Sequence, residues 1–211
     1  MRHILLVAMM LPFAAGAAEV PHAHHHPVAK VSSSLKKNPA VKEYVAASDV
    51  MHKAMDISYT GNADVDFAAG MMPHHQGAVD MVSVLHKYGK DAELRDLGNR
   101  IVTWQNAEIG IMKRWLAANQ GVAGCADAKS TSQYKEAMDA MHKAMDISYT
   151  GDADVDFVNG MIPHHQGAID MAWILIEHGR DPELRKISYD VIRSQEQEIK
   201  LMKNWLEKNK K

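Results

Sequence analysis

Apolar residues recur every three to four positions along most of the chain, a spacing that predicts helices. No segment shows a convincing alternation of apolar and polar residues with the period of a strand. The fold class is therefore expected to be all-α. The first expected helices cover about 39–57, 65–88 and 91–118, with Asn38, Asp64 and Asp91 as their N-caps and Gly89 as the C-terminal cap of the second.

The helical pattern then restarts. A shift of ninety residues aligns 51–116 with 141–206 without a gap, and 39 of the 66 aligned positions are identical. A long unit that occurs twice favours a duplicated helical unit with pseudo-twofold symmetry over a solenoid. We expect two repeats, over 39–118 and 131–211, joined by a linker over 119–130. Two helices of each repeat are expected to form one four-helix bundle, and an additional helix precedes these two in each repeat.

The first eighteen residues combine a short basic start, an apolar run and small residues, which is typical of a cleavable secretory signal. The apolar run is too short to span a bilayer. We therefore expect a periplasmic or secreted protein with no membrane span after cleavage. A formal net charge of -2 does not favour nucleic acid as a partner. The single cysteine, Cys125, excludes an internal disulfide and is interpreted as an incidental loop thiol.

Residues 19–38 are low in apolar content and are expected to form a disordered arm. Imidazoles bind borderline divalent ions such as Cu(II), so the arm is either an auxiliary metal site or an adventitious chelator. Its candidate ligands are His22, His24, His25 and His26.

Each repeat carries the same stretch of adjacent histidines flanked by methionines. In the first repeat Met71, His74 and His75 share one helical face, and Met81 lies seven residues beyond His74. The third helix presents Met112 on its buried face. The candidate metal ligands are therefore Met71, His74, His75, Met81 and Met112, with Met161, His164, His165, Met171 and Met202 in the second repeat.

A second Met and His cluster lies on the helix that precedes each repeat stretch. It either completes the first sites or forms others, and core packing is the alternative for Met51 and Met55. Its members are Met51, His52, Met55, Met141, His142 and Met145.

A ligating histidine needs a hydrogen-bond partner on its second ring nitrogen. Polar residues on the same buried faces are expected to orient the ligands in this way. They are Gln105, Glu108 and Asp80, with Gln195, Glu198 and Asp170 in the second repeat.

Thioether sulfur combined with imidazole selects copper(I), and by softness silver(I), over magnesium, calcium or manganese. Thioethers also do not oxidise to disulfides, which suits an exported protein. The residues therefore predict a soft-metal site. They do not decide which histidine of each pair faces the ion.

The pattern Phe-x3-Met-x-Pro-His-His-Gln-Gly-Ala-x-Asp-Met, followed by Gln-x2-Glu-Ile-x2-Met-x2-Trp-Leu, occurs at 67–116 and 157–206. It resembles the exported bacterial family called domain of unknown function 305, especially its CopM-type copper-binding members. The resemblance covers nearly all of the chain after the His-rich arm. It implies a ferritin-like four-helix bundle that binds copper, chiefly Cu(I), at the matching His and Met positions, with silver as a further candidate.

The leading hypothesis is a non-enzymatic protein that sequesters or carries Cu(I) in metal resistance or homeostasis, with a periplasmic copper exporter or chaperone as a candidate partner. The alternatives are a ferritin-like metal-dependent oxidase or reductase and a structural helical module without metal. Di-iron sites of ferritin-like proteins use Glu-x-x-His pairs, and none occurs in the four expected bundle helices.

Overall fold

The computed structural model describes residues 31–121 and 127–209. The expected signal, the four histidines of the arm and Cys125 lie outside these residues. Within them all regular structure is helical, which confirms the all-α prediction. The elements are η1 (Leu35–Lys37), α1 (Pro39–Ala54), α2 (Ala63–Tyr88), α3 (Ala92–Ala118), α4 (Ala128–Ala144), α5 (Ala153–His178) and α6 (Pro182–Asn209).

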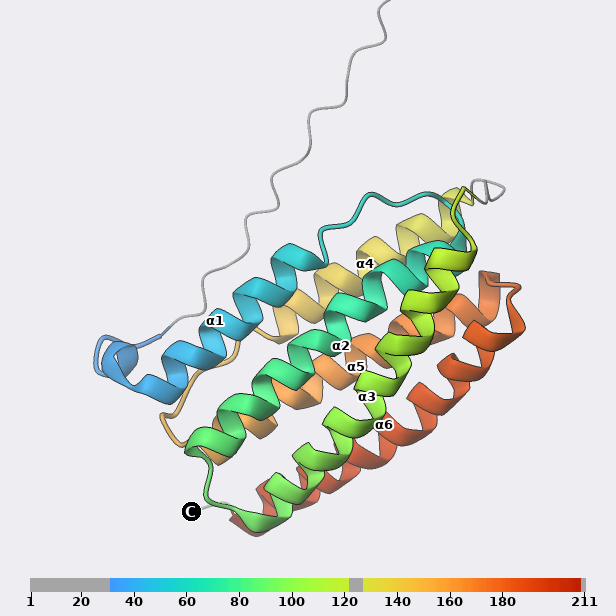
Figure 1. Ribbon diagram of the computed structural model, residues 1–211. Helices are drawn as coiled ribbons and strands as arrows, with labels where there is room; N and C mark the ends of the chain where they lie inside the picture. Colours follow the sequence, from blue (N-terminus) through green and yellow to red (C-terminus); the bar gives the residue numbers. More distant parts are fainter. Residues whose placement is uncertain (1–30, 122–126, 210–211) are drawn as a thin grey trace, which may run out of the picture.

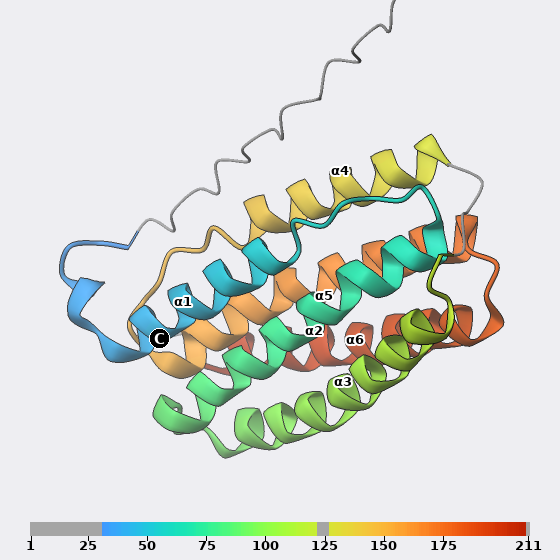
Figure 2. The same ribbon diagram turned by 45° about the horizontal axis from the view of Figure 1, so that its top comes forward.

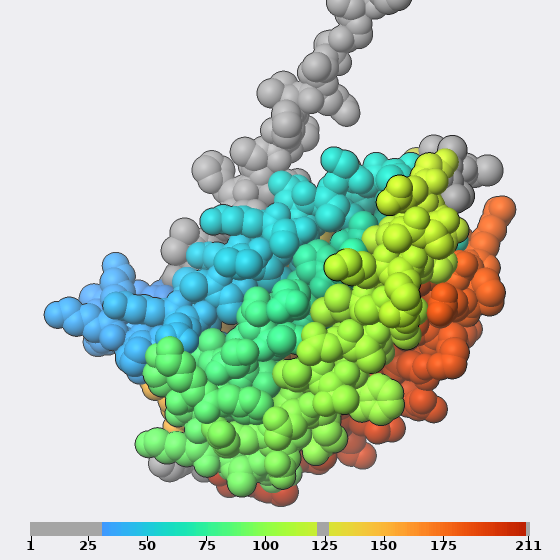
Figure 3. All heavy atoms as spheres, viewed as in Figure 1, coloured from blue at the N-terminus to red at the C-terminus, as the bar shows by residue number. Residues whose placement is uncertain are grey.

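The six α-helices pack in three layers of two (Figures 1 and 2). The repeat stretches lie on α2 and α5, which contact each other and form the central layer. The helices α3 and α6 cover one side of this layer and α1 and α4 cover the other. In Figure 3, α2, α3 and α6 lie side by side on one face of the molecule. The expected bundle of α2, α3, α5 and α6 is therefore present.

The helix starts follow capping chemistry with one correction. Asn38 caps α1 as expected, since its side chain accepts a hydrogen bond from the Val41 amide. Asp64 was expected to cap the second helix, but that prediction was wrong. Asn62 is the cap, because its side-chain oxygen accepts from the amides of both Asp64 and Val65.

Asp64 and its repeat counterpart Asp154 instead tie the two repeats together. The Asp154 carboxylate accepts hydrogen bonds from the amides of Lys90 and Asp91 in the α2–α3 turn, at 2.9–3.3 Å. Asp64 accepts equivalent bonds from the amides at the α5–α6 turn. The first turn of each central helix therefore accepts hydrogen bonds from the turn that follows the other central helix.

Gly89 is the C-cap of α2, although its φ of -71° is one that any residue adopts. The position needs glycine for space, because a Cβ there would lie 2.5 Å from the Asp154 carboxylate oxygen. Gly77 likewise leaves room for Met51 of α1, whose own Cβ would be 2.9 Å from an added Cβ. Glycine at these two positions therefore lets α1 and the first turn of α5 approach α2 closely.

Two boundaries differ from the expectation. The helix α4 begins at Ala128 with Asp127 as its cap, so the connection between the repeats is shorter than the expected linker. At the start of the described chain, Leu35–Lys37 form a turn of 3-10 helix rather than part of an irregular arm. None of the helices in residues 31–121 and 127–209 has the length and apolar content needed to cross a membrane.

Candidate functional site

The first histidines of the two repeats meet at the centre of the molecule. The Nε2 of His74 lies 3.0 Å from the carbonyl oxygen of His164, and the Nε2 of His164 lies 2.9 Å from that of His74. The ring centroids are 3.7 Å apart with the planes tilted by 40°, and both side chains are fully buried. The pair therefore joins α2 to α5 by two reciprocal hydrogen bonds on the pseudo-twofold axis.

These contacts determine the protonation of both rings. A carbonyl oxygen can only accept, so each Nε2 carries the hydrogen, and a neutral ring then has a bare lone pair on Nδ1. Burial, reinforced by the neighbouring histidines, lowers the pKa of His74 and of His164 well below the ordinary value for imidazole. Both rings are neutral at pH 7, which is the form that binds a metal.

The second histidines contact the bundle helices beside them. The Nε2 of His75 donates to Glu108 of α3 at 2.6 Å, and that of His165 donates to Glu198 of α6 at 2.7 Å. The imidazoles are fully buried, whereas each carboxylate is 13 % exposed. Each pair therefore extends from the bundle interior to its edge, with the charged group at the edge.

All four rings share one arrangement. In each, Nε2 is engaged by an oxygen, whereas Nδ1 is buried and has no hydrogen-bond partner among the described residues. A buried lone pair without a donor is costly in an apolar interior. It is also how a metal-ligating histidine is prepared, with one nitrogen held by a carbonyl or carboxylate and the other available.

The helix register brings methionines to the same level. Because His75 contacts Glu108 across antiparallel helices, the residue four positions before His75 lies level with the residue four positions after Glu108. These residues are Met71 and Met112, both fully buried. The second repeat places buried Met161 and Met202 in the same register around His165 and Glu198.

Met81 and Met171 lie farther along the central helices. A Cβ added at Gly160 of α5 would meet the Met81 methyl group at 2.9 Å. The sulfur of Met171 lies 4.0 Å from the equivalent position at Gly70. These two methionines therefore pack across the α2–α5 contact, with Met171 beside the residue that precedes Met71 and Met81 beside the residue that precedes Met161.

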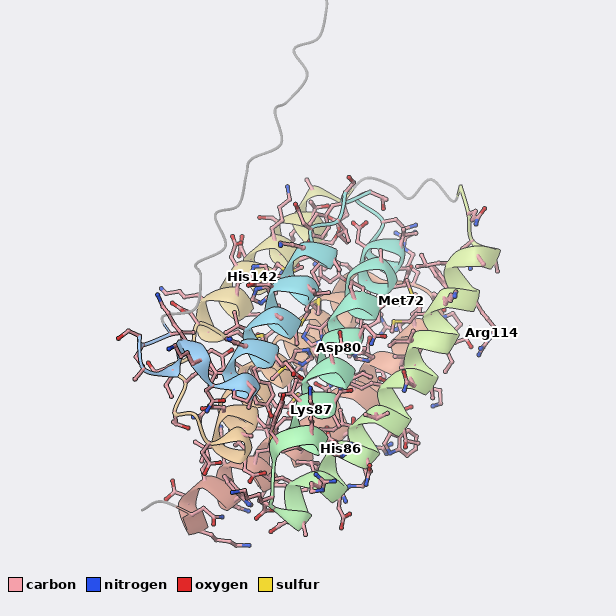
Figure 4. All side chains as sticks on the ribbon, turned by 60° about the vertical axis from the view of Figure 1, so that its left-hand side comes forward. Met72, Asp80, His86, Lys87, Arg114 and His142 are labelled. Atoms are coloured by element: carbon pink, nitrogen blue, oxygen red, sulfur yellow. The ribbon has the colours of Figure 1, made fainter. Side chains whose placement is uncertain are left out.

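The residues expected to orient the histidines divide into three groups. Glu108 and Glu198 do so directly. Gln105 and Gln195 are 3 % and 2 % exposed, and the Gln105 amide and the Gln195 side-chain oxygen have no hydrogen-bond partner in the described part of the chain. Asp80 and Asp170 bond Gln76 and Gln166 on their own helices and do not contact a histidine (Figure 4 labels Asp80).

The second Met and His cluster lies in the outer layer. His52 of α1 and His142 of α4 are in contact, with ring centroids 4.0 Å apart and planes tilted by 49°. Met51 and Met141 pack against Gly77 and Gly167, so their sulfurs fill the space between α1 and α2 and between α4 and α5. Met55 is 1 % exposed, and Met145 lines a small hollow beside the two rings.

Across residues 31–121 and 127–209, no three His, Cys, Asp or Glu side chains stand together in the geometry of a metal site. The only sequence feature that indicated the His74–His164 contact is the duplication, which places equal residues on both sides of a pseudo-twofold axis.

The chain is similar to known proteins in both sequence and structure. A family model described as "Domain of unknown function (DUF305)" matches residues 64–209. An uncharacterised protein, L153, of Acanthamoeba polyphaga mimivirus is 39% identical over 57 residues, and the match covers 27% of this chain and 38% of that protein. The chain thus spans well under half the length of this curated relative.

Solved structures of CopM are similar over most of their length. The Cu(I)-bound form is 34% identical with a TM-score of 0.55, covering 70% of this chain and 98% of CopM. The Ag-bound form obtained by soaking is 32% identical with a TM-score of 0.55, covering 70% and 97%. The Cu(II)-bound form is 34% identical with a TM-score of 0.53, covering 69% and 98%.

Proposed function

The chain belongs to the family of the domain of unknown function 305, and from that premise we propose that it binds copper, chiefly as Cu(I), in the core of its helical bundle. The observation that carries the proposal is the buried Nδ1 of His75 and of His165, each without a hydrogen-bond partner among the described residues while Nε2 of the same ring is held by a glutamate. The likeness to CopM structures with copper and silver bound supports the same class of ion.

The chemistry of the donors favours the monovalent ion. Imidazole nitrogen and thioether sulfur are neutral and soft, and together they select Cu(I) and Ag(I) over hard cations. Transfer of a single positive charge into the interior is also less costly than transfer of two. Silver is the second ion that this donor set suits.

We assign ligation to the second histidine of each pair. Met71 and Met112 lie one helical turn from His75 and Glu108, and the Glu108 carboxylate balances the charge of a bound cation at the bundle edge. His74 and His164 hold the two central helices together through their backbone contacts. The second site, in the other repeat, uses His165, Met161 and Met202.

The mechanism is exchange of metal ligands, and no covalent bond is made or broken. A Cu(I) ion is exchanged among Met and His donors, and the protein returns to its starting state when the ion leaves. Such a protein sequesters or carries copper outside the cytoplasm in resistance or homeostasis, and it needs no catalytic residue. The expected export signal and the scarcity of cysteine suit this role.

The test is an anaerobic Cu(I) titration against a competing chelator. The full-length mature chain carries serine in place of His22, His24, His25 and His26, so that the arm does not contribute. In this background, His75→Ala with His165→Ala removes one nitrogen ligand from each site and should abolish competition for Cu(I). Replacement of Glu108 and Glu198 by Gln should weaken binding about 10- to 100-fold, the usual effect of removing the partner of a ligating histidine.

The matched control is His86→Ala, which removes a histidine of the same helix that hydrogen-bonds the Arg95 carbonyl. It should leave Cu(I) affinity unchanged. The proposal is wrong if the parent protein takes no Cu(I) from a weak chelator, or if the variant lacking His75 and His165 competes as well as the parent. Circular dichroism of each variant confirms that the helices are retained.

A further inference from the structure

We propose that His52 and His142 form a second, separate site for a borderline divalent cation of the Cu(II) and Zn(II) class. Two outer helices supply one imidazole each, and aspartates beside them supply the negative charge. Figure 4 labels His142 on α4, beside α1. This site goes beyond the core Cu(I) sites, and neither site requires the other.

The two rings already meet. Their centroids are 4.0 Å apart, which is close enough for one ion to reach a nitrogen of each ring after rotation of the side chains. A small hollow beside them is lined by Asp49 of α1 and by Met145 and Asp146 after α4. Residues from both repeats therefore converge on one place, although the two histidines are ninety positions apart in the sequence.

Asp146 provides the independent reason to expect a cation. Its Oδ1 is buried and accepts no hydrogen bond from the described residues. A buried carboxylate oxygen without a donor is costly, and a bound cation removes that cost. The neighbouring Asp49 adds a second negative charge at the same hollow.

The donor set differs from that of the core. Imidazole with carboxylate suits Cu(II) and Zn(II), whereas imidazole with buried thioether suits Cu(I). The sulfurs of Met51 and Met141 are used in packing against Gly77 and Gly167. Met145 remains as the one thioether in the lining, so oxygen and nitrogen donors predominate.

The place of the pair also separates it from the core. The central layer of α2 and α5 lies between the α1–α4 layer and the helices that carry Glu108 and Glu198. His52 lies in the outer layer and is 9% exposed, whereas the core histidines are fully buried. Since no three such ligands in the described chain already stand in coordination geometry, an aspartate carboxylate must turn toward the rings as the ion binds.

The experiment is an aerobic titration of the mature chain with Cu(II), read by electron paramagnetic resonance and equilibrium dialysis. The background again has serine at His22, His24, His25 and His26, and it also carries His75→Ala and His165→Ala. We expect one Cu(II) per chain, with hyperfine splitting from two nitrogens. Replacement of His52 and His142 by Gln should remove this ion, and Asp146→Asn should weaken its binding at least tenfold.

The control His86→Gln should leave the Cu(II) signal unchanged. Zn(II) that displaces the Cu(II) one for one supports the proposed class of cation. The inference is overturned if the parent holds no Cu(II), or if the protein without His52 and His142 holds as much. The anaerobic Cu(I) titration distinguishes the two proposals, because Gln at 52 and 142 should leave core Cu(I) uptake intact in a chain that retains His75 and His165.

Discussion

At the scale of single residues, the adjacent histidines of each repeat have different tasks although they are identical in type. Neighbouring residues on a helix point about 100° apart, so one ring faces the partner central helix and the other faces α3 or α6. His74 bonds a backbone carbonyl, whereas His75 bonds a carboxylate. The first contact is structural, and the second supplies a negative charge that a bound cation can use.

The central pair should make the metal-free protein sensitive to mild acid. The pKa of His74 and of His164 is lowered in the folded state by burial, so the unfolded chain binds more protons below its own pKa of about 6.5. Stability is therefore fully present above about pH 6.5 and falls as the pH drops below it. Each histidine contributes a slope of at most about 1.4 kcal/mol per pH unit.

Urea unfolding of the metal-free protein at pH 7.5, 6.5 and 5.5 measures this effect. The steep fall should shrink when His74 and His164 are both replaced by Gln, which keeps a donor for the carbonyls but does not titrate. His86→Gln serves as the control and should retain the fall. Equal stability of the parent protein at pH 7.5 and 5.5 would contradict the assignment of neutral, buried rings.

At the scale of elements, glycine decides how closely α1 and α4 approach the central layer. The middle of α2 carries Gly77 where Met51 of α1 packs, and α5 carries Gly167 where Met141 of α4 packs. Helix propensity alone disfavours glycine at these positions by about 1 kcal/mol. Close packing of the methionines against bare backbone outweighs that cost.

Gly77→Ala should destabilise the protein by about 1–3 kcal/mol, because an added Cβ collides with the Cβ and the sulfur of Met51. Gly110→Ala in α3 is the matched control, since its Cβ would meet only the Arg114 guanidinium at 3.5 Å. That control should stabilise by up to about 1 kcal/mol through helix propensity. Thermal and urea unfolding measure both, and the packing argument fails if the two substitutions shift stability in the same direction.

At the scale of the whole molecule, the two repeats are fastened to each other at both ends and at the centre. Asp64 and Asp154 hold the turns of the opposite repeat, and Tyr44 and Tyr134 donate to the carbonyls of Ala153 and Ala63. The His74–His164 pair adds the central contact. These bonds all cross between repeats, so the duplicated unit forms one cooperative structure.

The pseudo-symmetric aspartates offer a test of this fastening. Asp154→Ala should destabilise the protein by about 1–3 kcal/mol, because it leaves the amides of Lys90 and Asp91 without their acceptor. Asp64→Ala should cost less, since the hydrogen bonds from Arg180 are exposed and water can replace the carboxylate. Urea unfolding compares the two. An equal loss, or a greater loss for Asp64→Ala, would show that burial does not set the strength of the contact.

The sequence by itself determined the all-helical class, the duplication, most helix ends and the candidate donors. These features are local, since they follow from apolar periodicity, capping residues and the recurrence of one stretch. Asp64 shows the limit of such reasoning. Its side chain could cap its own helix, and only the tertiary structure shows that it binds the turn of the other repeat while Asn62 takes the cap.

Only the tertiary structure decided which candidate metal ligands lie together in the bundle core and which lie in the outer layer. The sequence places His52 on the first helix and His74 and His75 on the second. Their contact partners lie ninety or thirty-three positions away in the sequence. Long-range contacts depend on how helices cross, which a local pattern does not encode. The same crossing that brings His74 against His164 directs His75 to Glu108 and leaves His52 with His142 in the outer layer.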